Sequence, residues 1–514
     1  MDGSDTRRIA GPSYKLKVKD FGPITAADLS LLPLTVLVGP SNTGKSYLAT
    51  LVYALHRCFR DRGRFADLPD RDAPDPDLFS LGEVGEWAKA IASAPAEAPS
   101  LPAFPPSAES YVRSSLKAAP GVGRRLGTEL ARCFGVARVQ DLVRQPQTGA
   151  AHAEIKIEIP RTGGEGVFGY GIALNGDGLV VAGHIQGRSN LANDQVDSVH
   201  TRSLHRHALR LGQQWPSHPE LPPAKGLDHV LYMHHVLHLL TETVGSWLIR
   251  PLGAGGVHYL PSDRAGMSHC RDVVVSSLLH RATTASSGPD ALLSGVAVDF
   301  LDQLVRLAGD DTDADPTGWL LAKHLEEAVL EGEVRIEDSD TRFPHILYRP
   351  AGWTRDLPLM RTSSMVSELA SIVLYLRYLV RPGDLLIIDE PEAHLHPATQ
   401  TVLAREVIRW VLGGCRVVVT THSEWFLEQI ANRVILDALP AEKRTGIEES
   451  GIAIDADDVG VWLFERDSKR GGSVVKKLGV DPDSGLFPTD HDAVSEALYN
   501  EGARIHNRQQ HSSL

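Results

Sequence analysis

The sequence has few cysteines, no excess of basic residues and no long apolar run. Four cysteines (Cys58, Cys133, Cys270 and Cys415) lie far apart in 514 residues and form no Cys-x-x-Cys pair. This spacing argues against a zinc cluster and against a disulfide framework, so we expect a reducing compartment. The formal net charge is −13, with acidic and basic residues mixed along the chain. Binding of nucleic acid by charge alone is therefore excluded, although a local groove is left open.

No stretch reaches the roughly 18 apolar residues that a membrane span needs. The first residues, MDGSDTRRIAGPS, are polar. From these two features we predict a cytoplasmic protein without a membrane partner. A chain of 514 residues exceeds the size at which a single hydrophobic core keeps growing, so we expect a principal domain with a large insertion or a second lobe.

Apolar strands alternate with helices at both ends of the chain. Near the N-terminus, residues 33–39 form a short apolar run that ends in glycine, and apolar residues at helical spacing follow it. Near the C-terminus, LLIID, ATQTVLAREVIRWVL, CRVVVTT and SEWFLEQIA alternate in the same way. Strands that are apolar throughout and separated by helices are typical of a parallel sheet covered on both faces. The sequence predicts an α/β fold whose mostly parallel sheet is assembled from N- and C-terminal blocks.

The composition changes between these two blocks. Residues 60–110 are rich in Asp, Pro, Ala and Ser, which predicts a loosely ordered insertion. AEIKIEI and the two apolar runs on either side of Asn175–Gly176–Asp177–Gly178 predict a small antiparallel sheet, because Asn-Gly and Asp-Gly favour tight hairpin turns. Residues 227–250 predict a long amphipathic helix. Two or three helices are expected from about 267 to 331, followed by two strands. The middle of the chain is therefore an α+β and helical insertion.

The motif GPSNTGKS at residues 39–46 indicates a phosphate-binding loop. It fits the pattern G-x-x-x-x-G-K-[ST], follows an apolar strand and opens a helix, as such a loop requires. The two glycines permit a tight turn in which successive backbone N–H groups face the phosphates. The lysine adds a charge for the outer phosphates, and the final hydroxyl is a ligand for Mg²⁺. The nucleotide-binding residues that the motif predicts are Gly39, Pro40, Ser41, Asn42, Thr43, Gly44, Lys45 and Ser46.

Two acids follow the strand LLIID. A phosphate loop needs a second carboxylate at the end of a neighbouring strand, and Asp389 supplies it. Glu390 is placed to orient or deprotonate the attacking water. In isolation, the same pair also fits a helix N-cap with an acidic first turn. Beside the phosphate loop, the pair favours hydrolysis: we predict Ser46 and Asp389 as ligands of Mg²⁺ and Glu390 as the catalytic base.

Three histidines lie near these acids. His394 and His396 are two residues apart in a loop, and a zinc site is one interpretation of them. No cysteine lies nearby, so a role in positioning the loop is favoured. His422 comes just after the strand VVVTT, where it would meet the γ-phosphate or the attacking water. The alternative for His422 is a structural role.

Together these motifs resemble the ABC-type ATPase head shared by SMC-like proteins, recombination ATPases and the OLD (overcoming lysogenization defect) group. The resemblance is closest to small prokaryotic AAA-family ATPases of the OLD-like kind. It covers residues 14–58 and 340–435 well, including DEPEAHLHP and TTHS, and the middle only loosely. YLPSDRAG at 259–266 and VWLFERD at 461–467 also resemble that group. The resemblance implies that Asp389 and Glu390 are the Walker B acids, that residues 392–396 form the D-loop region, and that His422 is the switch histidine.

The signature loop departs from that family's pattern. The family reads LSGGQ or LSGGE, whereas this chain has RTSSMVSELASIVLYL at residues 361–376. Ser363, Ser364 and Glu368 keep the serine and the acid, and the resemblance makes the two serines nucleotide-binding in trans. The paired glycines, whose freedom at positive φ shapes the loop, are absent. A simple N-cap at Ser364 is the alternative. For Arg264 the alternatives are a phosphate-directed finger and a structural salt bridge.

The resemblance implies a dimeric switch that binds ATP and Mg²⁺. Two heads of a homodimer would enclose the nucleotides, and the setting would be DNA transactions or antiphage defence with a separate nuclease as effector. One alternative is an OLD-like nuclease, but the D-x-D at Asp455 to Asp457 precedes a strand, and too few residues follow it for a Toprim domain. The other is an ATP-loaded scaffold that hydrolyses poorly.

On this interpretation the chain divides into five parts. Residues 14–59 and 341–435 are the two parts of the ATPase head. Residues 60–150 are the Pro/Ala/Asp-rich insertion, residues 151–340 the hairpin and helical middle, and residues 436–514 a C-terminal extension.

Overall fold

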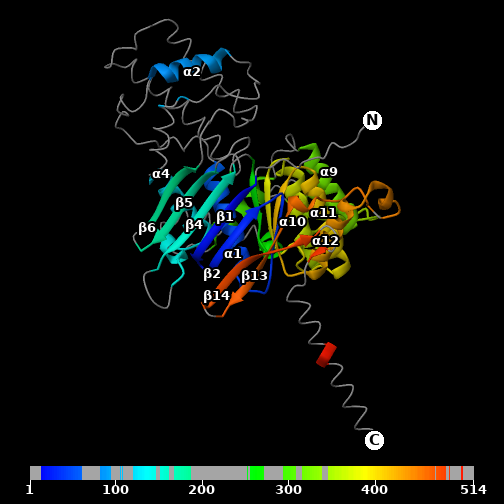
Figure 1. Cartoon of the computed structure of the whole chain (residues 1–514). Helices are drawn as coiled ribbons and strands as arrows, with labels where there is room; N and C mark the ends of the chain where they lie inside the picture. Colours follow the sequence, from blue (N-terminus) through cyan, green and yellow to red (C-terminus); the bar gives the residue numbers. More distant parts are fainter. Residues whose placement is uncertain are drawn as a thin grey trace.

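The computed structural model of the chain (Figure 1) describes a large part of it, in several ranges. These are residues 13–60, 81–93, 105, 107, 120–145, 151–160, 167–186 without 177, 252, 255–270, 293–307, 315–337, 345–481 without 448 and 469, 485–486 and 499–501. The predicted helix at 227–250 lies outside them. Within these ranges no helix is long and apolar enough to cross a membrane.

The strands fall into one large sheet, one small sheet and one short hairpin. Their bounds are β1 Tyr14–Phe21, β2 Ile24–Leu31, β3 Leu34–Val38, β4 Ala153–Pro160, β5 Val167–Asn175, β6 Gly178–Gln186, β7 Val257–Leu260, β8 Gly332–Glu337, β9 His345–Pro350, β10 Leu357–Pro358, β11 Leu385–Asp389, β12 Arg416–Thr421, β13 Val459–Asp467, β14 Gly472–Leu478, β15 Val480–Asp481 and β16 Gly485–Leu486.

Most of the α-helices lie in the C-terminal half of the chain. The α-helices are α1 Lys45–Arg60, α2 Leu81–Ser93, α4 Pro120–Phe134, α8 Gly295–Arg306, α9 Pro316–Leu325, α10 Ser364–Tyr378, α11 Pro397–Leu412 and α12 Glu424–Ala438. Short helical turns are η3 Val139–Leu142, η6 Glu326–Leu330, η7 Leu359–Arg361, η8 Ala441–Arg444 and η9 Ala456–Asp458. Residues 264–270 are also helical.

In the described part of the chain, the large sheet has 11 strands in the order β6-β5-β4-β1-β2-β14-β13-β3-β12-β11-β7. The strands β7, β11, β12, β3 and β13 run parallel to their neighbours within this group. The group β2, β1, β4, β5 and β6 is antiparallel throughout. The α/β class is confirmed, but the expectation of a mostly parallel sheet is wrong. The sheet is mixed because the antiparallel strands pair with β1 instead of forming a sheet of their own.

The two faces of the parallel strands belong to two different hydrophobic cores. On β11, Leu385 and Ile387 pack with α1 and the antiparallel strands, whereas Leu386 and Ile388 pack with α9 to α12. Side chains alternate between the faces of a strand, so a continuous apolar run serves both cores. Figure 1 shows α9, α10, α11 and α12 gathered at the parallel end of the sheet, away from β4, β5 and β6.

The insertion holds more regular structure than its composition predicts. Residues 81–93 form α2, although the whole of 60–110 was expected to be loose. Val84, Trp87, Ala88 and Ile91 are buried on one side of α2. Their helical spacing, rather than the overall abundance of Pro and Asp, decides the local structure.

Helices α9 and α10 approach closely at Gly318. A Cβ added to Gly318 would lie 2.3 Å from the carbonyl oxygen of Leu376 and 2.8 Å from that of Val380. We expect Gly318→Ala to lower the free energy of unfolding by about 1–3 kcal/mol, because the two helices must separate to admit the methyl group. Denaturant titration measures this change. The matched control is Gly266→Ala, where a Cβ would meet nothing within 4 Å; equal losses in both variants would contradict the packing explanation.

Candidate functional site

The phosphate loop connects β3 to α1 and turns through three residues with positive φ. These are Gly39 (136°), Asn42 (61°) and Gly44 (98°). A Cβ at Gly39 would also lie 2.5 Å from the carbonyl oxygen of Phe464 on β13. Glycine is therefore required at position 39 both by the backbone and by the neighbouring strand.

The Lys45 side chain folds back over the loop. Its Nζ donates to the carbonyl oxygens of Gly39 and Pro40, at 2.9 Å each. Burial lowers the pKa of Lys45, and the carboxylates of Glu390 and Asp389 oppose that shift. The ammonium is thus held inside the curve of the phosphate loop with its acids close by, which is where outer phosphates of a nucleotide need a positive charge.

Ser46 and Asp389 meet although 343 positions separate them in sequence. The Ser46 hydroxyl donates to Asp389 Oδ1 at 2.8 Å. Asp389 also accepts from the hydroxyl of Thr420, and from that of Tyr259 at 3.5 Å. Burial raises the pKa of Asp389, whereas the hydrogen bonds from Thr420 and Ser46 lower it. A hydroxyl beside a carboxylate is an oxygen donor set that fits Mg²⁺.

Glu390 lies beside Asp389 in a strained turn. Its φ is 48°, in the left-handed region, and its backbone N–H donates to Thr420 Oγ1 at 3.0 Å and to Thr420 O at 3.1 Å. Its carboxylate Oε1 is 3.1 Å from His422 Nε2. The hydrogen bond from His422 lowers the pKa of Glu390, and burial opposes it. The two residues predicted as catalytic therefore contact each other.

Glu392 has a positioning role that the sequence did not single out. Its carboxylate is buried and accepts from Thr421 Oγ1 at 2.6 Å and from the backbone N–H of His422 at 2.7 Å. It thereby ties the turn after β11 to the end of β12. Burial raises the pKa of this carboxyl group. The only sequence signal was its place two residues after Glu390 and the Thr-Thr-His that follows the next strand.

His394 and His396 serve the loop that connects β11 to α11. His396 is the N-cap of α11, and its Nδ1 accepts from the backbone N–H of Ala398 at 3.3 Å. His394 has a φ of 61° and its Nε2 is 3.9 Å from Glu368 Oε1. No group of three or more His, Cys, Asp or Glu side chains suited to a metal ion occurs among the described residues. These contacts agree with the interpretation that the two histidines position the loop.

Ser363 and Ser364 lie at the exposed N-terminus of α10. Ser363 is the N-cap, and its Oγ accepts from the backbone N–H of Val366 at 3.3 Å. The N-cap is thus Ser363, whereas the alternative considered from the sequence placed it at Ser364. Within the described ranges, neither serine makes a hydrogen bond to the phosphate loop of its own chain.

Arg264 is fully buried and faces protein atoms. Its guanidinium donates to the backbone carbonyl oxygens of Asp389 at 2.9 Å and of Glu390 at 3.2 Å, and its Nε is 3.0 Å from Glu368 Oε2. Of the two alternatives, the structural salt bridge is the one found.

The D-x-D of the tail forms a turn. The Asp455 carboxylate accepts from the backbone N–H of Asp457 at 2.8 Å, and the turn η9 leads into β13. Burial, together with the neighbouring acids, raises the pKa of Asp458 to about 6. The acids therefore precede a strand, the opposite of the order that the nuclease alternative needs.

Comparison with known proteins agrees with this site. Residues 320–427, which hold α10, β11, α11 and β12, match the AAA ATPase domain family. No curated protein sequence matches the chain.

Solved SMC head domains overlap loosely with the chain. A Smc head bound to the C-winged helix domain of ScpA is 10% identical, with a TM-score of 0.40, over 91% of this chain and 98% of the other. The SMC head domain from Thermotoga maritima is 12% identical, with a TM-score of 0.33, over 91% and 100%. The Smc head domain with an extended coiled coil, bound to the C-terminal domain of ScpA and derived from Pyrococcus furiosus, is 10% identical, with a TM-score of 0.37, over 91% and 97%.

The phosphate loop follows the carboxyl end of β3, and the Asp389–Glu390 turn follows the carboxyl end of β11. The two meet through the hydrogen bond from Ser46 to Asp389, and the segment that matches the AAA ATPase domain contains this turn. The chain therefore combines a phosphate-binding loop on an α/β sheet with a segment, residues 320–427, that is similar to the AAA ATPase domain.

Proposed function

We propose that the protein binds ATP with Mg²⁺ and hydrolyses it to ADP and phosphate. One observation carries the proposal: the Glu390 carboxylate contacts His422 Nε2 at 3.1 Å, directly beside the Asp389 that accepts from Ser46 of the phosphate loop. A carboxylate kept ionised next to the metal ligand is suited to take a proton from an attacking water. A protein that binds ATP without hydrolysing it has no need of Glu390 beside Asp389.

Each residue of the site has a separate task in this proposal. The N–H groups of residues 39–46 and the Lys45 ammonium bind the phosphates. Ser46 and Asp389 hold Mg²⁺, which neutralises charge on the β- and γ-phosphates when bound. Glu390 orients and deprotonates water, and His422 fixes the Glu390 carboxylate. Glu392 keeps His422 in place through the backbone N–H.

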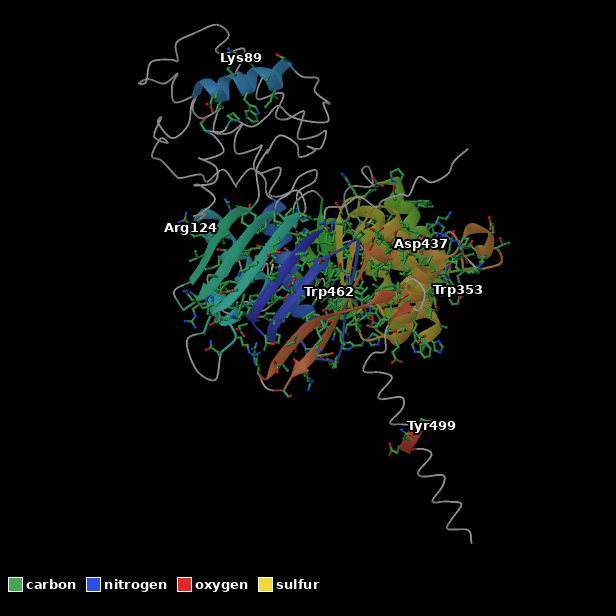
Figure 2. The ribbon with its side chains drawn as sticks, viewed as in Figure 1. Lys89, Arg124, Trp353, Asp437, Trp462 and Tyr499 are labelled. Atoms are coloured by element: carbon green, nitrogen blue, oxygen red, sulfur yellow. The ribbon has the colours of Figure 1, made fainter. Side chains whose placement is uncertain are left out.

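We further propose that two copies of the chain enclose the nucleotides as a homodimer through their ATPase heads. Ser363 and Ser364 are exposed at the start of α10, where the N-terminal end of the helix dipole favours an anion. Among the described residues they make no hydrogen bond to their own phosphate loop, which supports a contact to the nucleotide of a second subunit. Exposed Trp353 (56%) and Met360 (69%) precede them in sequence and offer apolar area for such a contact. Figure 2 shows Trp353 at the helical side of the molecule, away from Arg124 at the antiparallel end.

The proposed cellular setting rests on the resemblance to OLD-like ATPases. There the dimer would act as a nucleotide-gated switch in DNA transactions or antiphage defence, in the cytoplasm, with a separate nuclease as effector. The division into a two-part head, an insertion, a middle region and a C-terminal extension belongs to the same proposal.

A second candidate is an ATP-loaded scaffold with very slow turnover. The segment RTSS at residues 361–364 favours it, because the paired glycines that shape an ordinary signature loop are replaced by bulkier residues. The two functions differ in the rate of hydrolysis, not in the binding of ATP.

Steady-state phosphate release by the purified chain, with Mg²⁺ and with EDTA, tests the proposal. We expect turnover with Mg²⁺ and essentially none with EDTA, since Mg²⁺ neutralises the phosphate charge. Light scattering of Glu390→Gln should give twice the mass of one chain with ATP and Mg²⁺, and a lower mass without nucleotide. A chain that binds ATP but releases no phosphate would support the scaffold instead. One constant monomer mass in every nucleotide state would contradict the homodimer.

A further inference from the structure

Arg264 joins segments that lie far apart in sequence. It begins the helical segment 264–270, which residues 261–263 connect to β7, and is 0% exposed. Its Nη1 donates to the carbonyl oxygens of Pro261 at 3.2 Å and of Asp389 at 2.9 Å, and its Nη2 donates to that of Glu390 at 3.2 Å. A guanidinium presents five N–H donors in a rigid fork, which suits it to hold several carbonyl oxygens at once.

The same side chain reaches the start of α10. Arg264 Nε is 3.0 Å from Glu368 Oε2 and donates to the Glu368 carbonyl oxygen at 3.2 Å. Glu368 is buried, one turn after the exposed serines of α10. A second contact joins the same two helical segments, because His269 Nε2 lies 3.0 Å from Ser367 Oγ. The N-terminal turn of α10 is therefore fixed to the backbone of the Asp389–Glu390 turn through one residue.

The turn needs such support. Glu390 has a φ of 48°, and a non-glycine residue keeps this strained conformation only where its surroundings hold it. The Glu390 N–H is held by Thr420 and its carbonyl oxygen by Arg264. We expect that removal of the Arg264 contact would let the backbone relax and move the Glu390 carboxylate away from His422.

We propose that Arg264 is a positioning residue for ATP hydrolysis, which holds the backbone of Glu390 and, through Glu368, makes the placement of Glu390 depend on the position of α10. This inference rests on the proposed ATPase function. Arg264 binds no phosphate in this role, because its side chain is fully buried and its N–H groups already donate to backbone carbonyl oxygens. Its effect falls on the rate of hydrolysis and leaves the binding of ATP largely unchanged.

Three variants of the full-length chain test the proposal. Arg264→Lys keeps the charge but lacks the fork that reaches the carbonyl oxygens of Pro261, Asp389 and Glu390. Glu368→Gln keeps the shape of the partner and removes its charge. The matched control is Glu326→Gln, which removes the charge of another buried acid that pairs with α10, through Arg377 at the far end of that helix. The measurements are kcat and KM for ATP, the Kd of ATP, and amide hydrogen exchange of the peptide spanning 385–397.

We expect kcat to fall by about 10- to 100-fold in Arg264→Lys and about tenfold in Glu368→Gln, as for other groups that orient catalytic residues, while Kd changes by less than about threefold. Hydrogen exchange of 385–397 should accelerate in both and stay unchanged in Glu326→Gln. Equal kcat losses in Glu368→Gln and Glu326→Gln, or wild-type kcat in Arg264→Lys, would overturn the proposal. If Arg264→Lys does not fold, Glu368→Gln decides.

The exchange measurement separates the two proposals. If the wild-type chain releases no phosphate, the ATPase function fails. Faster exchange of 385–397 in Glu368→Gln would then still show that the ion pair holds the turn, and unchanged exchange would overturn that as well.

Discussion

Glu390→Gln is expected to lower kcat for ATP hydrolysis by about 10²- to 10⁴-fold, the usual contribution of a general base. Glutamine has the size of glutamate and keeps an oxygen that can accept from His422 Nε2, so the turn after β11 retains its contacts. What is lost is the negative charge and the ability to accept a proton. The Kd of ATP should stay within about threefold of wild type, because Glu390 does not belong to the phosphate loop.

Phosphate release and equilibrium binding of ATP, measured on the same preparation, check this prediction. The control is Glu442→Gln, which removes the charge of an exposed glutamate in η8. A variant that hydrolyses ATP at the wild-type rate would remove Glu390 from the mechanism. A loss of ATP binding equal to the loss of turnover would instead assign Glu390 a role in holding nucleotide.

Lys45→Ala is expected to weaken ATP binding by roughly 10²- to 10³-fold. Lys45 is 4% exposed, and its ammonium lies within the curve of the phosphate loop, where its contacts to phosphate oxygens would be charge-assisted. Each such hydrogen bond contributes about 1.5–3 kcal/mol, and about 1.4 kcal/mol corresponds to a factor of ten in Kd. Hydrolysis should fall with binding, because fewer sites are occupied.

Isothermal titration with ATP and Mg²⁺ measures this effect. Lys443→Ala, at an exposed lysine of η8, serves as the control for loss of one positive charge. The melting temperature without nucleotide should be nearly unchanged in Lys45→Ala, because the hydrogen bonds of the lysine to the described residues go to carbonyl oxygens of its own loop. Stabilisation by ATP should disappear. A variant that keeps wild-type affinity for ATP would rule out the phosphate loop as the nucleotide site.

The phosphate loop could be predicted because its signal is local. Gly39 to Ser46 contains its own turn residues, and the apolar strand before it and the helix after it are written in adjacent segments. The Asp389–Glu390 turn could be predicted for the same reason. The contact between Glu390 and His422 follows from the parallel pairing of β11 with β12, in which Asp389 lies opposite Thr420. That pairing was expected from two apolar strands separated by one helix.

The pairing of some strands could not be predicted, because their partners are remote in sequence. The alternation of β4 predicts a strand but not that its partner is β1, because any strand edge of the same pattern satisfies the same hydrogen bonds. Trp462 is buried on β13, in the middle of the large sheet (Figure 2). The sequence predicts that strand, yet nothing in it places β13 between β14 and β3.

The sequence by itself determined the α/β class, the phosphate loop and the acids that meet it, because these rest on short motifs and on the periodicity of neighbouring residues. Only the tertiary structure decided that the sheet is mixed, that Glu392 fixes His422, and that Arg264 faces backbone carbonyl oxygens and Glu368 instead of a phosphate. The physical reason is burial: a charged side chain inside the protein needs polar partners, and which partners are available depends on the packing of segments far apart along the chain.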